Sequence, residues 1–404
     1  MDPRSNPYTP NAGARPPALV GRDAEIEAFD VLLHRLEQGR SQQSMIITGL
    51  RGVGKTVLLG AFREAAMERR WVTVEAEVTK NSDFADRMSR LARRALLTLS
   101  APETWKQRAR QAAGIVKSFS LTFKPDGSVA AGLNVDAAPG LADSGDLSDD
   151  LTDVFVALGE AAQEASLGVV FLLDEIQYLG PGELEALIAA LHKTVQRALP
   201  VTLVAAGLPQ IPRLAGEAKS YSERLFVFPR IGPLSDVDAL AALSIPAREL
   251  GITFEDDALT SIVEYTEGYP YFIQEYGRIV WDHALGGAIS IDDVRSVRGL
   301  VESQLDESFF RVRADRATPL ELQYLRAMAE LGPDAHKAGE VAELLNRTSI
   351  QLGPTRASLI DKGLLYTPSH GLAAFTVPQF DRHMKRNHRL DPPPLRKTAP
   401  RPEL

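Results

Sequence analysis

Short apolar runs alternate with amphipathic stretches along the first half of the chain. Four of these runs are almost wholly apolar or alternate with a period of two, and they predict buried strands at residues 45–49, 71–78, 168–174 and 200–207. Between them, apolar residues recur at helical spacing, for example at Ile26, Phe29, Leu32, Leu33 and Leu36. Strands that are apolar on both faces and alternate with helices are typical of a parallel sheet covered on two sides. The pattern therefore predicts an α/β fold.

The pattern changes twice in the second half of the chain. Residues 233–310 hold four helical segments and no strand, which predicts an all-α lid. Residues 318–387 hold three short helices and then two short strands around Ser-His-Gly, an order that predicts a winged helix-turn-helix. The predicted domains are an extended tail (1–18), an α/β core (19–232), a helical lid (233–312), a winged helix (313–388) and a Pro-rich basic tail (389–404).

One segment inside the core predicts an insertion. Phe119, Leu121 and Phe123 alternate with polar residues, a Pro-Asp-Gly sequence follows, and residues 129–135 alternate again. Two alternating runs joined by a tight turn indicate a β-hairpin. We therefore expect a hairpin insertion at about residues 118–135.

Composition limits the class of protein. The chain has 404 residues, 44% of them hydrophobic, and a formal net charge of -8, so no overall basic field attracts nucleic acid or anionic lipid. It has no cysteine, which excludes disulfides and thiolate zinc sites. The first residues lack the apolar core of a signal peptide, and the densest apolar run is too short to span a bilayer. We expect a cytoplasmic protein without a membrane partner.

The first predicted strand leads into a phosphate-binding pattern. The sequence MIITGLRGVGKTVLL, from Met45 to Leu59, fits G-x-x-x-x-G-K-[ST] at every fixed position. Backbone N–H groups of such a loop face the phosphates, the lysine reaches the β- and γ-phosphates, and the hydroxyl ligates Mg²⁺. A chance glycine-rich turn is the alternative, but the required strand and helix flank the loop. The predicted nucleotide-binding residues are Gly49, Leu50, Arg51, Gly52, Val53, Gly54, Lys55, Thr56 and Val57.

A second buried strand ends in two acidic residues. Asp174 and Glu175 follow the apolar run GVVFLL, and a carboxylate at the mouth of such a strand can hold Mg²⁺ beside Thr56. Glu175 is then the candidate that polarises the attacking water in phosphoryl transfer. An exposed Asp-Glu helix cap is the alternative interpretation, and the phosphate loop makes it the weaker one.

These pieces together resemble a known family. The segments LVGRDAEI, GLRGVGKT, LLDEIQ, SERLF and GYPYFIQEYG resemble, in this order, the AAA+ and STAND P-loop ATPases, and most closely the bacterial and archaeal group with an origin-recognition-type ATPase domain. The resemblance covers about residues 17–310, and the winged helix extends it to about 388. It implies that Val20, Gly21 and Arg22 line an adenine pocket. It also implies ATP and Mg²⁺ as ligands, and the absence of an N/T-K-x-D motif is consistent with ATP over GTP.

The resemblance also implies residues that would distinguish subfamilies. Arg224 stands where AAA+ proteins keep a finger that touches a neighbour's γ-phosphate, which would require self-association; a surface arginine paired with an acid is the alternative. Tyr271 stands where origin-type initiators carry an arginine, and Gly268-Tyr269-Pro270 resembles the turn of STAND switches, in which Pro270 packs near the nucleotide. Pro270 also suits the first position of a helix. The strand at 200–207 ends without Asn, Asp or Arg, so we expect slow hydrolysis.

The C-terminal residues leave two kinds of partner open. A recognition helix at residues 350–362 would present Gln351, Arg356 and Lys362 to double-stranded DNA. Residues 382–404 carry seven Lys or Arg residues and two acidic ones, whereas residues 315–381 are not basic. Winged helices also dock proteins, so the alternative to a DNA-associated ATPase is a STAND-type signalling switch with a protein partner. A kinase is disfavoured because no substrate-phosphate arginine cluster follows the loop.

Overall fold

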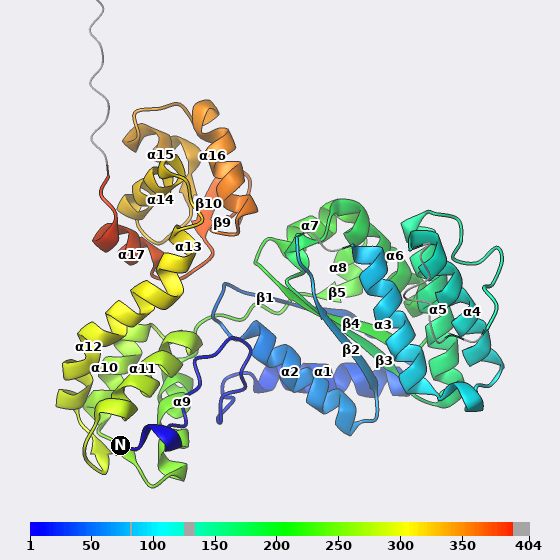
Figure 1. Cartoon of the computed structure of the whole chain (residues 1–404), viewed down its shortest axis with the longest axis horizontal. Coiled ribbons are helices and arrows are strands. Elements are labelled where there is room, and N and C mark those ends of the chain that lie inside the picture. The colour runs from blue at the N-terminus through cyan, green and yellow to red at the C-terminus, as the bar shows by residue number, and fades with distance from the viewer. Residues whose placement is uncertain (81–82, 125–132, 134, 391–404) are drawn as a thin grey trace, which may run out of the picture. The chain divides into compact units, whose positions relative to one another are not determined.

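The computed structural model describes residues 1–80, 83–124, 133 and 135–390 of the chain (Figure 1). Contacts divide it into two compact units, Met1–Ser290 and Ile291–Leu404. The helix at 291–305, which the sequence placed in the lid, groups with the second unit. Within the described ranges, no helix combines the length and the apolar character needed to cross a bilayer.

A parallel five-stranded sheet forms the centre of the first unit. Its order is β2-β3-β4-β1-β5, and every pairing is parallel. The strands are β1 (Ser44–Thr48), β2 (Val72–Glu77), β3 (Val169–Asp174), β4 (Val201–Gly207) and β5 (Phe226–Val227). All residues of β1, β3 and β4 are buried, as expected for strands covered on both faces. The α/β fold predicted from the sequence is confirmed.

Helices cover both faces of the sheet (Figure 1). One face carries α1 (Asp23–Glu37) and α2 (Lys55–Glu68), whose apolar sides meet where Phe29 packs on Phe62 at 4.6 Å. The other face carries α3 (Phe84–Leu99), α5 (Leu147–Ala165) and α6 (Pro181–Gln196), with α4 (Gln107–Phe123) packed against α3 and α5. Between β4 and β5 lie α7 (Ile211–Ala218) and α8 (Ser222–Leu225).

The predicted hairpin at 118–135 is wrong in its first half. Residues 118–123 are the last turns of α4, and Phe119 contacts Phe123 with ring centroids 4.8 Å apart. Positions four apart share a helix face, so the spacing of these two aromatics fits a helix as well as a strand. Burial of Ala112, Ile115 and Val116 on the same side of α4 decides for the helix. The second half of the predicted hairpin lies mostly outside the described residues.

Three helices follow the sheet within the first unit. They are α9 (Asp236–Glu249), α10 (Asp256–Thr266) and α11 (Pro270–His283), and the short strands β6 (Thr253–Phe254) and β7 (Ala288–Ile289) pair beside them. The N-terminal residues, predicted as an extended tail, pack on this group. Tyr8 is buried there and donates its hydroxyl proton to the Leu243 carbonyl oxygen of α9 at 2.6 Å.

The second unit joins one long helix to a small mixed domain. It begins with α12 (Ile291–Leu305), a π-helical turn η4 (Asp306–Arg311) and α13 (Val312–Ala314). Next come α14 (Pro319–Leu331), α15 (Ala338–Leu344) and α16 (Ser349–Asp361), with β8 (His336–Lys337), β9 (Leu365–Tyr366) and β10 (Leu372–Phe375) in one antiparallel sheet. The last helix is α17 (Phe380–Asn387). This order contains every element predicted for the winged helix, which as a functional name remains a prediction.

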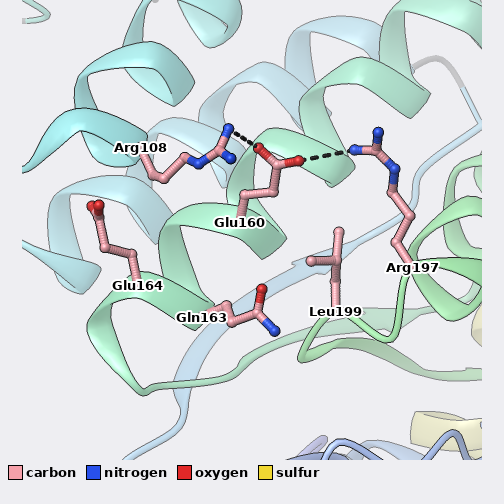
Figure 2. Close-up of a pocket in the computed structure, with 6 residues that line it drawn as sticks. All are labelled: Arg108, Glu160, Gln163, Glu164, Arg197 and Leu199. Carbon is pink, nitrogen blue, oxygen red and sulfur yellow. Dashed lines mark hydrogen bonds and ion pairs between the residues drawn. The ribbon is translucent and has the colours of Figure 1, made fainter.

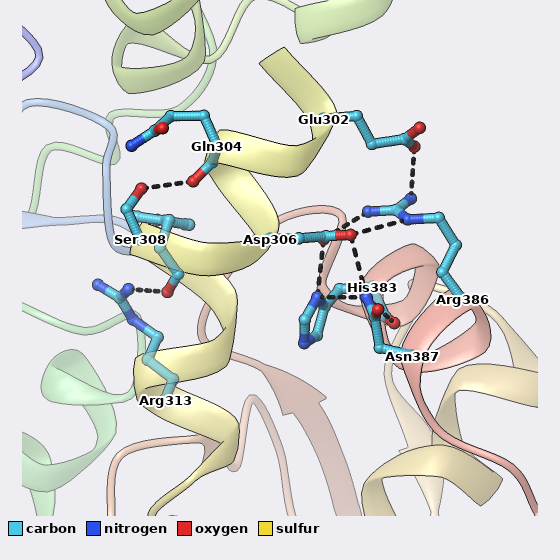
Figure 3. Close-up of polar contacts among 9 residues, drawn as sticks. Glu302, Gln304, Asp306, Ser308, Arg313, His383, Arg386 and Asn387 are labelled. Atoms are coloured by element: carbon cyan, nitrogen blue, oxygen red, sulfur yellow. Dashed lines mark hydrogen bonds and ion pairs between the residues drawn. The ribbon is translucent and has the colours of Figure 1, made fainter. Parts of the chain in front are cut away.

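A polar network fixes the π-helical turn to α17 (Figure 3). Asp306 accepts hydrogen bonds from His383 Nδ1 at 2.7 Å, Arg386 Nη2 at 2.7 Å and Asn387 Nδ2 at 3.0 Å. Burial raises the pKa of Asp306, but these donors outweigh it and hold the pKa below its usual value. The His383 ring stacks on Phe310, and burial lowers its pKa despite the Asp306 carboxylate.

Candidate functional site

The phosphate loop connects β1 to α2 at the carboxyl edge of the sheet. Gly54 has φ 92°, a left-handed conformation that glycine adopts without strain, and it is the N-cap of α2. The loop therefore turns sharply into the helix, whose free N–H groups point back toward the loop. This geometry suits an anion, because the helix dipole adds partial positive charge at the same point.

Lys55 lies folded back on the loop that carries it. Its Nζ donates to the carbonyl oxygens of Gly49 at 3.1 Å and Leu50 at 3.0 Å, and its side chain is buried. Burial lowers the pKa of the Lys55 ammonium, while the nearby Glu175 and Asp174 carboxylates oppose that shift. An incoming phosphate would replace these two neutral carbonyl acceptors by anionic oxygens, which bind an ammonium group more strongly.

Thr56 and Asp174 meet although 118 positions separate them. The Thr56 hydroxyl donates to Asp174 Oδ2 at 2.5 Å. Burial raises the pKa of Asp174, and the hydrogen bond from Thr56 opposes that shift. A hydroxyl and a carboxylate side by side form the donor set that Mg²⁺ uses with substrate phosphates. Among the described residues, no group of three His, Cys, Asp or Glu side chains could hold a metal by itself.

Glu175 is held by a residue that the sequence did not single out. Glu175 adopts φ 56°, a left-handed conformation unusual for a side chain-bearing residue, at the end of β3. Gln177 donates from Nε2 to Glu175 Oε2, and its Oε1 accepts from the Leu208 backbone N–H at 3.1 Å. Gln177 thus connects Glu175 to the end of β4, the strand that has no polar residue of its own there. Its position two residues after Glu175 was the only available signal.

The Val20–Arg22 turn and the start of α11 both adjoin the phosphate loop. Arg22 is buried and donates from Nη2 to Gly232 O at 2.7 Å and to Val53 O at 3.2 Å. Pro270 is the first residue of α11, and the next N–H, that of Tyr271, donates to Gly52 O at 3.3 Å. The structure therefore brings together the loop, the turn, Pro270 and the acidic pair.

Arg224 is not part of this group of residues. It lies exposed on α8, directly before the edge strand β5. An exposed arginine at a sheet edge can reach another molecule, and nothing in the described part of the chain gives its side chain an acidic partner.

The three residues predicted to contact DNA each make a contact within their own unit, and their role toward DNA remains a prediction. Gln351 accepts from Thr348 N at 3.0 Å within the capping box of α16. Arg356 donates to Leu372 O at 2.6 Å, and Lys362 Nζ lies 2.6 Å from Glu321 Oε2. Burial raises the pKa of Glu321, but Lys362, Ser358 and Thr318 lower it to about 2 overall. These contacts occupy the basic side chains of Arg356 in α16 and of Lys362 at its C-cap.

A separate surface pocket lies at the opposite edge of the sheet (Figure 2). It is lined by Arg108, Glu160, Gln163, Glu164, Arg197 and Leu199. Glu160 accepts from Arg108 at 2.8 Å and from Arg197 at 2.9 Å. Leu199 precedes the amino end of β4, whereas the phosphate loop lies at the carboxyl ends. The two arginines are balanced by two acids, so the pocket offers no net charge to a ligand.

Comparisons with known proteins match the part of the chain that carries the phosphate loop and the acidic pair. Residues 18–204 match the AAA ATPase domain family, and residues 307–384 match a domain of unknown function (DUF8462). The first match confirms the ATPase domain that the sequence predicted. No curated protein matches the chain.

Solved structures extend the likeness over most of the chain. The chain is similar to the Walker-type ATPase paby2304 of Pyrococcus abyssi, with 17% identity, TM-score 0.54, and coverage of 92% of this chain and 97% of that one. It also matches Orc1 of Aeropyrum pernix, solved with DNA, at 16% identity, TM-score 0.45 and coverage of 92% and 94%. Cdc6p of Pyrobaculum aerophilum matches at 16% identity, TM-score 0.44 and coverage of 96% and 99%. At such identities the likeness to the Pyrococcus ATPase concerns the fold alone.

Proposed function

We propose that this chain, whose residues 18–204 form an AAA ATPase domain, binds ATP with Mg²⁺ and hydrolyses it slowly as a conformational switch. The observation that carries the proposal is the contact between Thr56 and Asp174 beside the Gly49–Thr56 loop. It would join the two halves of a magnesium–phosphate site, the loop after β1 and the carboxylate at the end of β3, both of which the sequence predicted. Both halves lie at the carboxyl edge of a parallel sheet, where ligands of such folds bind.

Each residue has a distinct part in the proposed reaction. The loop N–H groups and Lys55 bind the phosphates, while Thr56 and Asp174 would hold the metal. Bound Mg²⁺ would neutralise charge on the phosphate oxygens. Glu175 would orient and polarise the attacking water, and Gln177 would position Glu175. Glu175 acts only on the attacking water, so its loss should lower the rate of ATP hydrolysis and leave the ATP affinity unchanged.

The position of the lid would depend on which nucleotide is bound. Tyr271 N–H already touches Gly52 O, so a rearrangement of the loop on phosphate binding reaches α11 directly. Pro270, at the start of this helix, would pack near the nucleotide, as in the STAND turn that this sequence resembles. Slow hydrolysis suits such a switch, and it fits a β4 end that carries no Asn, Asp or Arg and is followed by a contact to the Gln177 side chain.

For the C-terminal partner, one observation favours protein over DNA. The exposed charged residues between positions 338 and 361 are Glu340, Glu343, Arg347 and Asp361, so this face has no positive excess. DNA affinity depends on neutralising phosphates. Ile350, at the start of α16, is 87% exposed, and this apolar side chain offers nothing to a phosphate. DNA binding would then depend on the basic residues from Arg382 onward.

Two variants test the ATPase proposal. Lys55→Ala should weaken ATP binding about 10- to 100-fold, as expected for a lost charge-assisted hydrogen bond, whereas Lys193→Ala, an exposed control on α6, should bind as the parent does. Glu175→Gln should bind ATP and lose hydrolysis. Parental ATP affinity in Lys55→Ala would refute the loop assignment, and parental turnover in Glu175→Gln would refute the role of Glu175.

A second experiment separates the partners. The full chain is mixed with labelled duplex DNA at low salt, with and without ATP. No shift in either state supports a protein partner. A shift that weakens with salt, with a log–log slope of about -0.9 per phosphate contact, supports DNA.

A further inference from the structure

The N-terminal segment, residues 6–15, contacts both the lid helices and the core. Asn6 Nδ2 donates to Asp282 Oδ1 of α11 at 2.7 Å and to Arg278 O at 2.9 Å. Thr9 N–H donates to Gln274 Oε1 of the same helix at 3.0 Å. The segment therefore follows α11 toward the helix start, which is the end that contacts the phosphate loop.

Tyr8 anchors this segment in a site shaped for its ring. Tyr8 is 3% exposed, meets Trp281 edge-on at 6.3 Å and reaches α9 through its hydroxyl. A Cβ on Gly277 of α11 would lie 2.7 Å from the Tyr8 ring, closer than two carbon atoms can approach. Glycine at position 277 is what lets the ring come this close to the helix.

The other end of the segment passes the phosphate loop. An ideal Cβ on Gly13, whose φ is +73°, would lie 3.4 Å from Thr56 Cγ2, so the backbone there touches the first turn of α2. Arg15 then pairs with Glu64, two turns further along α2. Between the anchor and Thr56, a turn closes with Ala14 N–H donating to Asn11 O at 3.2 Å. Residues 9–13 thus cross from the lid to the residue that would ligate the metal.

We propose that residues 9–13 form a strap that covers the nucleotide site and sets the rate at which nucleotide leaves. The inference rests on the ATP site proposed above. The loop, the Val20–Arg22 turn and the start of α11 line the site, and the strap spans the remaining distance between α11 and Thr56. Nucleotide release then requires the strap to lift, and the buried Tyr8 ring opposes that motion because lifting exposes it to water.

Release of a fluorescent ADP analogue, measured by stopped flow with excess unlabelled ADP, tests the strap. Tyr8→Ala removes the anchor, and Gly277→Ala displaces the ring from the opposite side without altering the strap. Both should release nucleotide about tenfold faster or more, since opening of a covering segment limits release. Arg4→Ala is the control, because Arg4 is exposed and its side chain pairs with the neighbouring Asp2; its release rate should match the parent's.

Hydrogen exchange of the peptide covering residues 1–15 shows whether each variant frees the strap. Faster exchange with parental release rates would overturn the proposal while leaving the ATP site intact. Unchanged exchange in both variants would overturn Tyr8 as the anchor. A parental protein that binds no nucleotide at equilibrium would refute the proposed function itself, and the strap with it.

Discussion

The Thr56 hydroxyl lies 2.5 Å from Oδ2 of Asp174, and this contact joins the helix after β1 to the end of β3. Strand β4 stands between β1 and β3 in the sheet. Because parallel strands end at one edge, a residue following one strand can reach across a neighbour to the next but one. The same edge holds Glu175 and Gln177, and the first prediction concerns that pair.

Replacing Gln177 by Leu should lower ATP turnover about 10- to 100-fold and leave ATP affinity unchanged. The leucine keeps the volume but loses the hydrogen bond to Glu175, and positioning of a catalytic group is worth about that factor. Single-turnover hydrolysis and equilibrium binding measure the two quantities separately. A melting temperature equal to the parent's shows that β4 is intact, and a parallel loss of affinity and turnover would contradict a positioning role.

Arg224→Ala tests self-association. If Arg224 reaches a neighbour's γ-phosphate, the specific activity of the parent should rise with protein concentration, and the variant should lose that rise at unchanged ATP affinity. An arginine finger can contribute about 10³-fold or more to turnover. Arg213→Ala, on the adjacent α7 and paired locally with Glu217, is the matched control. A parental rate independent of concentration would leave Arg224 without this role.

Lys362→Ala should destabilise the C-terminal unit by about 1–3 kcal/mol, because the Glu321 carboxylate, only 3% exposed, loses a charged partner. Chemical denaturation followed by circular dichroism measures the change. Lys337→Ala removes an exposed lysine of the same unit and should have little effect. Equal stability of the two variants would show that the Lys362–Glu321 pair contributes nothing, and Lys362 would again be available as a DNA contact.

The stability of the C-terminal unit should fall as the pH is lowered from 7 toward 5. The pKa of His383 is lowered in the folded chain by burial, so the unfolded state binds a proton first and acid favours unfolding. Stability from this group is complete above the unfolded pKa of about 6.5 and is lost as the pH falls toward the folded value. Burial also lowers the pKa of His388, which acts in the same direction.

His383→Asn separates the two histidines. The amide has no charge to gain in this range and can still donate toward Asp306, so the fall in stability between pH 7 and 5 should become shallower, leaving the part due to His388. Denaturant midpoints across this range provide the measurement. A slope identical to the parent's would exclude His383 as a contributor.

The sequence predicted the site better than it predicted its surroundings. The Gly49–Thr56 loop and Asp174 follow from local rules, because a motif and an apolar strand each act over a few residues. The loop and Asp174 lie together because the sheet is parallel, and the pattern of strands and helices also predicted a parallel sheet. Gln177 was missed because its acceptor Glu175 follows β3 and its donor Leu208 follows β4, and no local pattern encodes a contact to the second strand end.

Two other features show what local sequence patterns do not predict. The spacing of Phe119 and Phe123 fits both the helical and the strand period. Burial of this segment against neighbouring helices favours the helix. Tyr8 sits in a Pro- and Asn-rich stretch that reads as an unpacked tail, yet its hydroxyl partner lies 235 positions away. Interactions over such separations depend on the folded arrangement of other elements, which composition does not reveal.

The position of Lys55 beside the loop carbonyls affects the charge balance of the site. With Arg51, Lys55 places two formal positive charges beside the two formal negative charges of Asp174 and Glu175, so these four side chains carry no net formal charge. Free ATP would bring about four negative charges into it, whereas ATP already complexed with Mg²⁺ brings about two. Side chains without net charge would favour nucleotide and cation as one unit, and ATP in excess over magnesium should compete only weakly for the site.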